Sequence, residues 1–127
     1  MAERLTSISG SSRSFVGGAV VYSNELKTEF AGVPPSLLER HGAVSRQVAA
    51  SLAEGIRERC DTTFGVGITG IAGPSGGTEE KPVGLVFVGV SDGKNTEVVE
   101  RRFHGDRYRI RYYTSQLALD LVRRRLM

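Results

Sequence analysis

The segment 67–78, Gly-Ile-Thr-Gly-Ile-Ala-Gly-Pro-Ser-Gly-Gly-Thr, carries five glycines among hydroxyl side chains and directly follows an apolar run. Glycine adopts left-handed backbone angles without steric cost and lets main-chain N–H groups approach a phosphate or another anion closely. The segment therefore predicts an anion- or nucleotide-contacting loop at the end of a strand. A tight turn that only reverses the chain is the alternative, because the segment matches neither the dinucleotide fingerprint nor the Walker P-loop.

Tyr22 and Lys27 form a candidate acid–base pair. They lie in the segment 22–27, Tyr-Ser-Asn-Glu-Leu-Lys, which ends a second apolar run, and open α/β sheets place ligand contacts where strands end. Burial can lower the pKa of a lysine until it serves as a base toward a hydroxyl, while a nearby tyrosine relays a proton. A solvated helix lysine is the alternative. Ser12, in the turn Gly10-Ser11-Ser12, can contact a substrate or simply satisfy the backbone of its own turn.

These residues require strands and helices to position them. Apolar runs predict buried strands at 16–22, 63–68 and 83–90, and a strand at 96–103 follows a hairpin turn at Asp92-Gly93, so the last two should be antiparallel. We expect helices at 24–30 and 45–59, a brief helical turn at 36–39, and a final helix capped by Asp106. This order predicts a single α/β domain over residues 1–127, with three α/β/α layers and a mixed sheet.

Composition narrows the class of protein. The chain has 127 residues, of which 39% are hydrophobic and 24% charged, as in an ordinary globular domain. A lone cysteine, Cys60, and the lack of a long apolar run predict a cytoplasmic protein without a membrane segment. His41 and His104 are isolated, so we expect no metal. Arginines gather after residue 100, but three of them end the last helix, where they favour its dipole, and nucleic acid is not the expected partner.

Several motifs in a fixed order resemble those of the C-terminal domain of the competence/damage-inducible protein family CinA. The resemblance spans nearly the whole chain, and its motifs are Gly10-Ser11-Ser12, Gly17-Gly18, the segments 22–27 and 41–45, Gly32-Val33-Pro34, and the segments 69–74 and 80–84. It implies hydrolysis of the carboxamide of nicotinamide mononucleotide to nicotinic acid mononucleotide and ammonia, without a metal or another cofactor.

The resemblance also implies roles for individual residues. Tyr22 and Lys27 match the family's catalytic tyrosine and lysine, and Ser12, Thr69 and Arg109 match further active-site positions. Thr69 and the amides that follow it, at Gly70 and Gly73, are expected on the substrate, and Arg109 on its phosphate.

One departure from the family concerns the nucleophile. Family members carry a nucleophilic serine in a Glu-Ser-Cys/Thr-Thr-Gly-Gly type of motif upstream of the segment that corresponds to residues 2–6, and this chain begins at Met1. The chain is then part of a longer enzyme, a shortened homologue that still binds nucleotide, or an enzyme that uses Ser23. A sheet shortened by a strand exposes unpaired edge groups, so we also expect a homo-oligomer.

Overall fold

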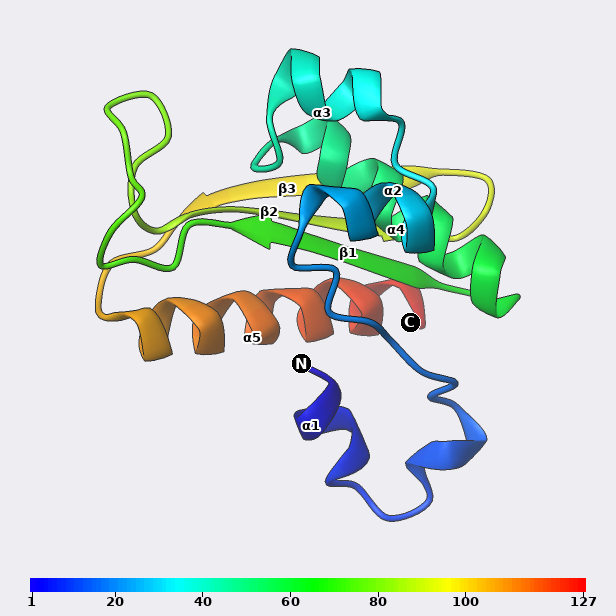
Figure 1. The fold of residues 1–127 in the computed structure, drawn as a ribbon. Helices are drawn as coiled ribbons and strands as arrows, with labels where there is room; N and C mark the ends of the chain where they lie inside the picture. Colours follow the sequence, from blue (N-terminus) through cyan, green and yellow to red (C-terminus); the bar gives the residue numbers. More distant parts are fainter.

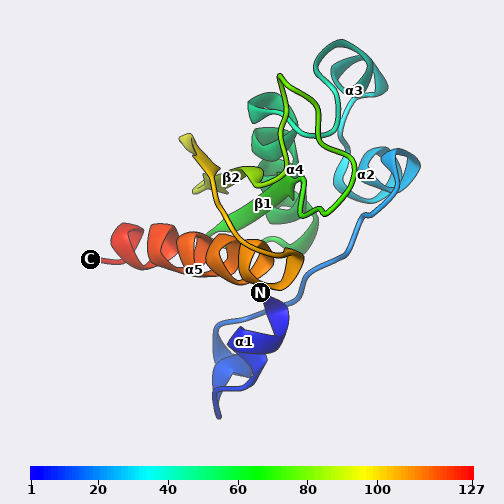
Figure 2. The ribbon, with the colours of Figure 1, turned by 90° about the vertical axis from the view of Figure 1, so that its left-hand side faces the viewer.

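Three antiparallel strands form the centre of the computed structural model, which describes residues 1–127 (Figures 1 and 2). They are β1 (Gly65–Gly70), β2 (Leu85–Ser91) and β3 (Thr96–Arg102), in the order β1-β2-β3. In the middle of the sheet Val88 lies opposite both Ile68 and Val99. Every residue of β2 is buried, as expected for a central strand covered on both faces. The predicted β2–β3 hairpin is confirmed.

Helices cover both faces of this sheet. On one face lies α4 (Arg46–Cys60), against which α2 (Asn24–Ala31) and α3 (Pro35–His41) pack; on the other lies α5 (Arg107–Arg125) (Figures 1 and 2). The α/β class and the three layers are therefore confirmed. Two short elements, α1 (Ala2–Thr6) and the 3-10 helix η1 (Ser11–Arg13), lie beyond α5, on its side away from the sheet (Figures 1 and 2).

The two long helices begin where the sequence predicts. The Ser45 hydroxyl accepts a hydrogen bond from Val48 N at 3.2 Å, and the Asp106 carboxylate accepts one from Arg109 N at 2.9 Å. Each of these side chains satisfies a main-chain donor that the first turn of a helix leaves free. On α5 the apolar face contains Ile110 and Leu121, both buried. The two long helices are therefore fixed at their starts by local signals.

Helix α4 approaches the sheet closely because glycines face it. A Cβ atom at Gly67 of β1 would lie 2.7 Å from Leu52 Cβ and 2.5 Å from Ala53 N, and it would also collide with the carbonyl of Ala49. Gly89 of β2 faces the same carbonyl, with a Cβ position 2.7 Å away. Side chains at these two positions would push α4 off the sheet. This close contact places the end of β1 beside the start of α4.

The predicted buried strand at residues 16–22 is wrong. This segment is extended, but it makes no main-chain hydrogen bond to a neighbouring strand, and Val16 and Val20 are 68% and 83% exposed. Only Val21 packs against the core, on the cluster around Val33 and Val48. An apolar run forms a buried strand only when a neighbouring strand pairs with it. The mixed sheet predicted together with this strand is also not observed, because the three strands pair only antiparallel.

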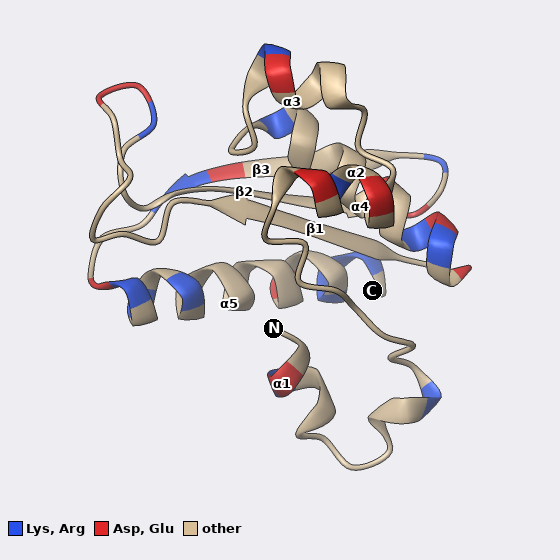
Figure 3. Ribbon diagram, in the orientation of Figure 1, with Lys and Arg blue, Asp and Glu red and all other residues tan.

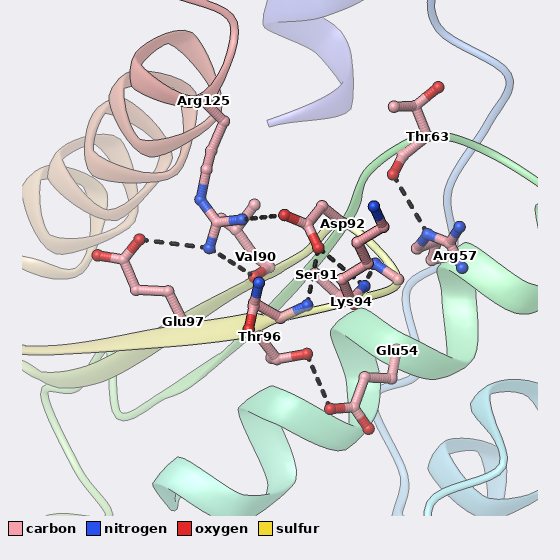
Figure 4. Close-up of polar contacts among 12 residues, drawn as sticks. Glu54, Arg57, Thr63, Val90, Ser91, Asp92, Lys94, Thr96, Glu97 and Arg125 are labelled. Carbon is pink, nitrogen blue, oxygen red and sulfur yellow. Dashed lines mark hydrogen bonds and ion pairs between the residues drawn. The ribbon is translucent and has the colours of Figure 1, made fainter.

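A charged network closes the end of the sheet where β2 turns into β3 (Figure 4). Arg125 Nη1 lies 2.9 Å from Asp92 Oδ2, and its Nη2 lies 3.4 Å from Glu97 Oε2. The other oxygen of Asp92 accepts hydrogen bonds from the main-chain amides of Lys94 at 2.9 Å and Asn95 at 2.8 Å. These two amides are the largest cause of the lowered pKa of Asp92, and Arg125 adds to it.

Basic side chains occupy both ends of α5 (Figure 3). Arg107, Arg109 and Arg111 lie in its first turns, and residues 123–125 are arginines in its last turn, where they favour the helix dipole as predicted. Arg123 and Arg124 pair with Asp120. None of the helices has both the length and the apolar composition that crossing a membrane requires.

Candidate functional site

The connection between β1 and β2, residues 71–84, is called the glycine loop here. Its base is closed by hydrogen bonds from Ile71 N to Leu85 O at 3.0 Å and from Gly84 N to Ile71 O at 2.7 Å. Beyond this base, main-chain amides without a hydrogen-bond acceptor follow one another along the loop, at Ala72, Gly73, Ser75, Gly76 and Gly77. Unpaired amide donors bind anions readily. The predicted loop at the end of a strand is thus present, with donors available to a ligand.

Two of the predicted ligand-contacting glycines are also required by the shape of the loop. Gly73 is buried and has a φ of +78°, and a Cβ atom there would lie 2.5 Å from Val83 Cγ1. A Cβ atom at Gly70 would lie 2.7 Å from Val86 Cγ1. The positive φ at Gly73 is one that other residues adopt only at a cost. A larger residue at Gly73 therefore displaces the loop, and one at Gly70 displaces the end of β1 from which the loop starts.

Arg107 connects the glycine loop to Tyr22. Its Nη1 donates to Gly73 O at 2.9 Å, and its Nη2 donates to the Tyr22 hydroxyl at 3.2 Å. Tyr22 is 80% exposed, directly before α2, and Arg107 is the first residue of α5. Sequence reasoning missed this arginine. The available signal was its place directly after the Asp106 cap, where a side chain extends from a fixed helix start.

Arg109, the arginine expected on a phosphate, contacts no other side chain through its guanidinium. Its main-chain amide bonds to Asp106, and its side chain runs along Gly105, where the nearest side-chain atom is 3.2 Å from a hypothetical Cβ. Its guanidinium forms no ion pair and no hydrogen bond. Arg109 is exposed and lies two residues after Arg107 on the same helix. Its role in binding a phosphate stays a prediction.

Lys27 is buried, with 8% of its surface exposed. Its Nζ donates to Val21 O at 3.0 Å and lies 3.5 Å from Tyr22 O, and no carboxylate pairs with it. Burial lowers the pKa of Lys27 from its ordinary value, and the charge of Glu25 opposes this only in part. The solvated helix lysine considered above is therefore excluded. The amine is instead turned back toward the segment that carries Tyr22.

Ser23 does not meet Lys27 as a nucleophile would. Its hydroxyl accepts a hydrogen bond from Leu26 N at 3.2 Å and so serves as the N-cap of α2. The donors of Lys27 Nζ go to main-chain carbonyls instead. Activation of a serine requires a base within hydrogen-bond reach of its hydroxyl. In this arrangement Ser23 has a structural role.

Thr69 lies at the end of β1, with 8% of its surface exposed. Its hydroxyl donates to Ala43 O at 2.7 Å, and Lys81 Nζ of the glycine loop donates to His41 O, also at 2.7 Å. Ser45 Oγ donates to Gly42 O at 2.9 Å. These three bonds fix the segment 41–45 beside the start of the glycine loop. The Thr69 oxygen keeps its acceptor capacity for a further donor.

Ser12 lies apart from the other predicted site residues. It belongs to η1, which lies with α1 beyond α5, whereas α2 lies on the opposite face of the sheet (Figures 1 and 2). The structure therefore brings Tyr22, Arg107 and Gly73 together directly, with Lys27 behind Tyr22 and Thr69 at the base of the loop. The chain contains no group of three or more His, Cys, Asp or Glu side chains that could hold a metal ion.

The fold and this site define a three-layer α/β domain that carries a loop of free amide donors at one end of its sheet. A model of the CinA C-terminal domain family matches residues 1–126, and the chain belongs to that family. CinA-like proteins of Koribacter versatilis and Acidobacterium capsulatum are 65% and 68% identical to it over 127 residues, which are all of this chain but 31% of each relative. The chain thus spans about a third of the length of these curated relatives.

Solved structures agree with this assignment. The competence/damage inducible protein CihA from Agrobacterium tumefaciens matches with a TM-score of 0.93 and 41% identity, over 95% of this chain and 74% of that one. A CinA superfamily protein from Escherichia coli matches with a TM-score of 0.90 and 29% identity, over 95% of this chain and 70% of that one. The arrangement of elements in this chain is therefore that of the CinA superfamily.

Proposed function

We propose that this domain binds nicotinamide mononucleotide at the glycine loop and takes part in hydrolysis of its carboxamide. In that reaction the C–N bond of the carboxamide breaks, ammonia leaves, and the elements of water complete the carboxylate of nicotinic acid mononucleotide. The observation that carries the proposal is the row of unpaired amides from Ala72 to Gly77, beside an arginine that has no carboxylate partner. Such donors stabilise a phosphate, or the oxyanion that forms when an amide is attacked.

Lys27 and Tyr22 supply the proton-transfer groups in this proposal. Because burial lowers the pKa of Lys27, a larger fraction of its amine is neutral near physiological pH than for a solvated lysine. A neutral amine accepts the proton of an attacking hydroxyl, and the same group then protonates the leaving ammonia. The Tyr22 hydroxyl is bound by Arg107, which also binds Gly73 of the glycine loop. Thr69, Gly70 and Arg109 are proposed as substrate contacts.

A second candidate function is a non-catalytic module that binds pyridine nucleotides. The specific observation in its favour is that no serine or threonine hydroxyl contacts Lys27 Nζ, whose donors go to the carbonyls of Val21 and Tyr22. Without a hydroxyl at the base, nucleotide binding at the glycine loop does not lead to hydrolysis. The two candidates therefore share the ligand and differ in the nucleophile.

Two measurements separate these candidates. Ammonia release from nicotinamide mononucleotide is assayed for this chain and for a form extended upstream in the reading frame. Activity in the extended form alone would assign the nucleophile to the upstream segment, and inactivity of both would refute hydrolysis. Calorimetry with nicotinamide mononucleotide and nicotinic acid mononucleotide tests binding, with Arg111→Ala as the matched control for Arg109→Ala. If neither nucleotide binds and Arg109→Ala changes nothing, the ligand site is refuted as well.

We further propose that the chain functions in the cytoplasm as a homo-oligomer. The segment 16–22 supports self-association, because its main-chain donors are unpaired and Val16 and Val20 are exposed. Extended segments of this kind pair with a strand of another molecule. Light scattering at micromolar concentration is expected to show a mass above that of one chain, 13.7 kDa. A stable, monodisperse monomer would contradict this proposal.

A further inference from the structure

We propose that Arg107 is a positioning residue that fixes the Tyr22 hydroxyl as a hydrogen-bond donor beside the glycine loop. The inference rests on the proposed function for the identity of the ligand, but the link between Arg107 and Tyr22 is tested separately below. The observation that carries it is the pair of bonds made by one guanidinium, to Gly73 O at 2.9 Å and to the Tyr22 hydroxyl at 3.2 Å.

The chemistry of the guanidinium sets the direction of the Tyr22 hydroxyl. An arginine side chain donates hydrogen bonds and accepts none, so the Tyr22 oxygen must be the acceptor in this contact. The phenol hydrogen is then turned away from Arg107, and it donates to no group of the protein. Tyr22 therefore presents one free O–H donor beside the amides of the glycine loop.

The position of the Tyr22 ring depends on this contact. With 80% of its surface exposed, the side chain has little packing to restrict it, and its hydroxyl has no other hydrogen-bond partner. Arg107 itself extends from a helix start that the Asp106 cap holds in place. The restraint therefore passes from a rigid helix, through Arg107, to a tyrosine that would otherwise rotate freely.

The same side chain also restrains the loop. Its second bond holds the carbonyl of Gly73, in the middle of the unpaired amides. One arginine thus sets both the tyrosine donor and the amide donors relative to each other. A ligand that uses both groups binds a prearranged site, which lowers the cost of ordering it. Arg107 acts through these groups, and it need not touch the ligand.

The link itself is tested by NMR of the chain labelled with 13C in its tyrosine rings. The chain has four tyrosines, and the Tyr22 signal is the one that Tyr22→Phe removes. Arg107→Ala is expected to move this signal, and Arg107→Lys also, because an ammonium cannot bridge both acceptors as the planar fork does. Arg111→Ala, an exposed arginine of the same helix without partners, should leave it in place. A Tyr22 signal that neither Arg107 variant moves would overturn the proposal.

The functional part is tested by calorimetric binding of nicotinamide mononucleotide in a double-mutant cycle. Arg107→Ala is expected to weaken binding roughly tenfold in the otherwise unaltered chain. In a Tyr22→Phe background the same substitution should weaken binding by roughly threefold or less, since part of its effect passes through Tyr22. Equal losses in both backgrounds would overturn the role of Arg107 in positioning Tyr22. If the unaltered chain binds no nucleotide, the proposed function fails, and the NMR result alone then decides whether Arg107 fixes Tyr22.

Discussion

Replacing Gly67 by alanine is expected to destabilise the domain strongly, because the added methyl group has no space. Its position would be 2.7 Å from Leu52 Cβ and 2.5 Å from Ala53 N, and it would also collide with the carbonyl of Ala49. Two of these contacts are with the main chain of α4, which cannot change rotamer. The helix as a whole must therefore retreat from β1, and this retreat also loosens its contacts with β2.

The size of the effect follows from the packing. Overfilling a close-packed core costs about 1–3 kcal/mol, and a collision with a helix backbone belongs at the upper end, about 3 kcal/mol. Exchanging glycine for alanine in a strand returns up to roughly 1 kcal/mol. A net loss of about 2 kcal/mol lowers the melting temperature of a domain of this size by roughly 8 °C. Thr69, two residues further along β1, moves with the strand, so its bond to Ala43 O weakens too.

Urea unfolding followed by circular dichroism measures this loss, with Gly17→Ala as the matched control. A Cβ atom at Gly17 would meet nothing within 4 Å, and the segment around it is exposed. The control should therefore unfold within about 0.5 kcal/mol of the unaltered chain. If Gly67→Ala also unfolded within about 0.5 kcal/mol of the unaltered chain, the close approach of α4 to β1 would be refuted. The explanation of how Thr69 is placed would then fail as well.

Three further perturbations test the charged groups. Because burial lowers the pKa of Lys27, the unfolded chain binds this proton more tightly than the folded chain. The free energy of unfolding therefore rises with pH until the ordinary lysine pKa of 10.5 is reached. Lys27→Met should lose that rise, and equal slopes of unfolding free energy against pH in the variant and the unaltered chain would contradict this. The lowered pKa of Asp92 stabilises the fold at neutral pH and ceases to do so as pH falls through it. Asp92→Ala should therefore be less stable at neutral pH, with the gap closing in acid, and a constant gap would refute this. Arg4 joins α1 to α5 through hydrogen bonds to Ser115 at 2.9 Å and Gln116 at 2.7 Å, so Arg4→Ala should speed tryptic cleavage at Arg13; an unchanged rate would contradict it.

The elements that the sequence predicts correctly depend on local signals. The hairpin needs only Asp92-Gly93 between two apolar runs, and the long helices need only the Ser45 and Asp106 caps before a periodic apolar face. Each of these signals lies within a few residues of the feature it sets. The segment 16–22 fails for the same reason, because a strand requires a partner that its own residues do not specify.

The candidate site was predictable in part. The glycine loop was found because glycines are visible in the sequence, whereas the sequence left burial of Lys27 open against a solvated helix lysine. Arg107 was missed because its partner Gly73 lies 34 positions away. Arg107 and Arg109 are two arginines in the first turn of the same helix, and the sequence does not distinguish them. Only the fold shows that Arg107 reaches the loop. Ser12 could not be placed from sequence, since its distance from the loop depends on where η1 packs.

Helix α5 contacts both ends of the sheet through an arginine, and the two arginines differ in whether their charge is compensated. At the hairpin end Arg125 is paired with the carboxylates of Asp92 and Glu97, so its charge is already compensated. At the other end Arg107 has no carboxylate partner, and the amides from Ala72 to Gly77 have no acceptors. Uncompensated donors and positive charge favour an anionic ligand there. This difference favours the glycine loop as the site of an anionic ligand, and it does so independently of the family to which the chain belongs.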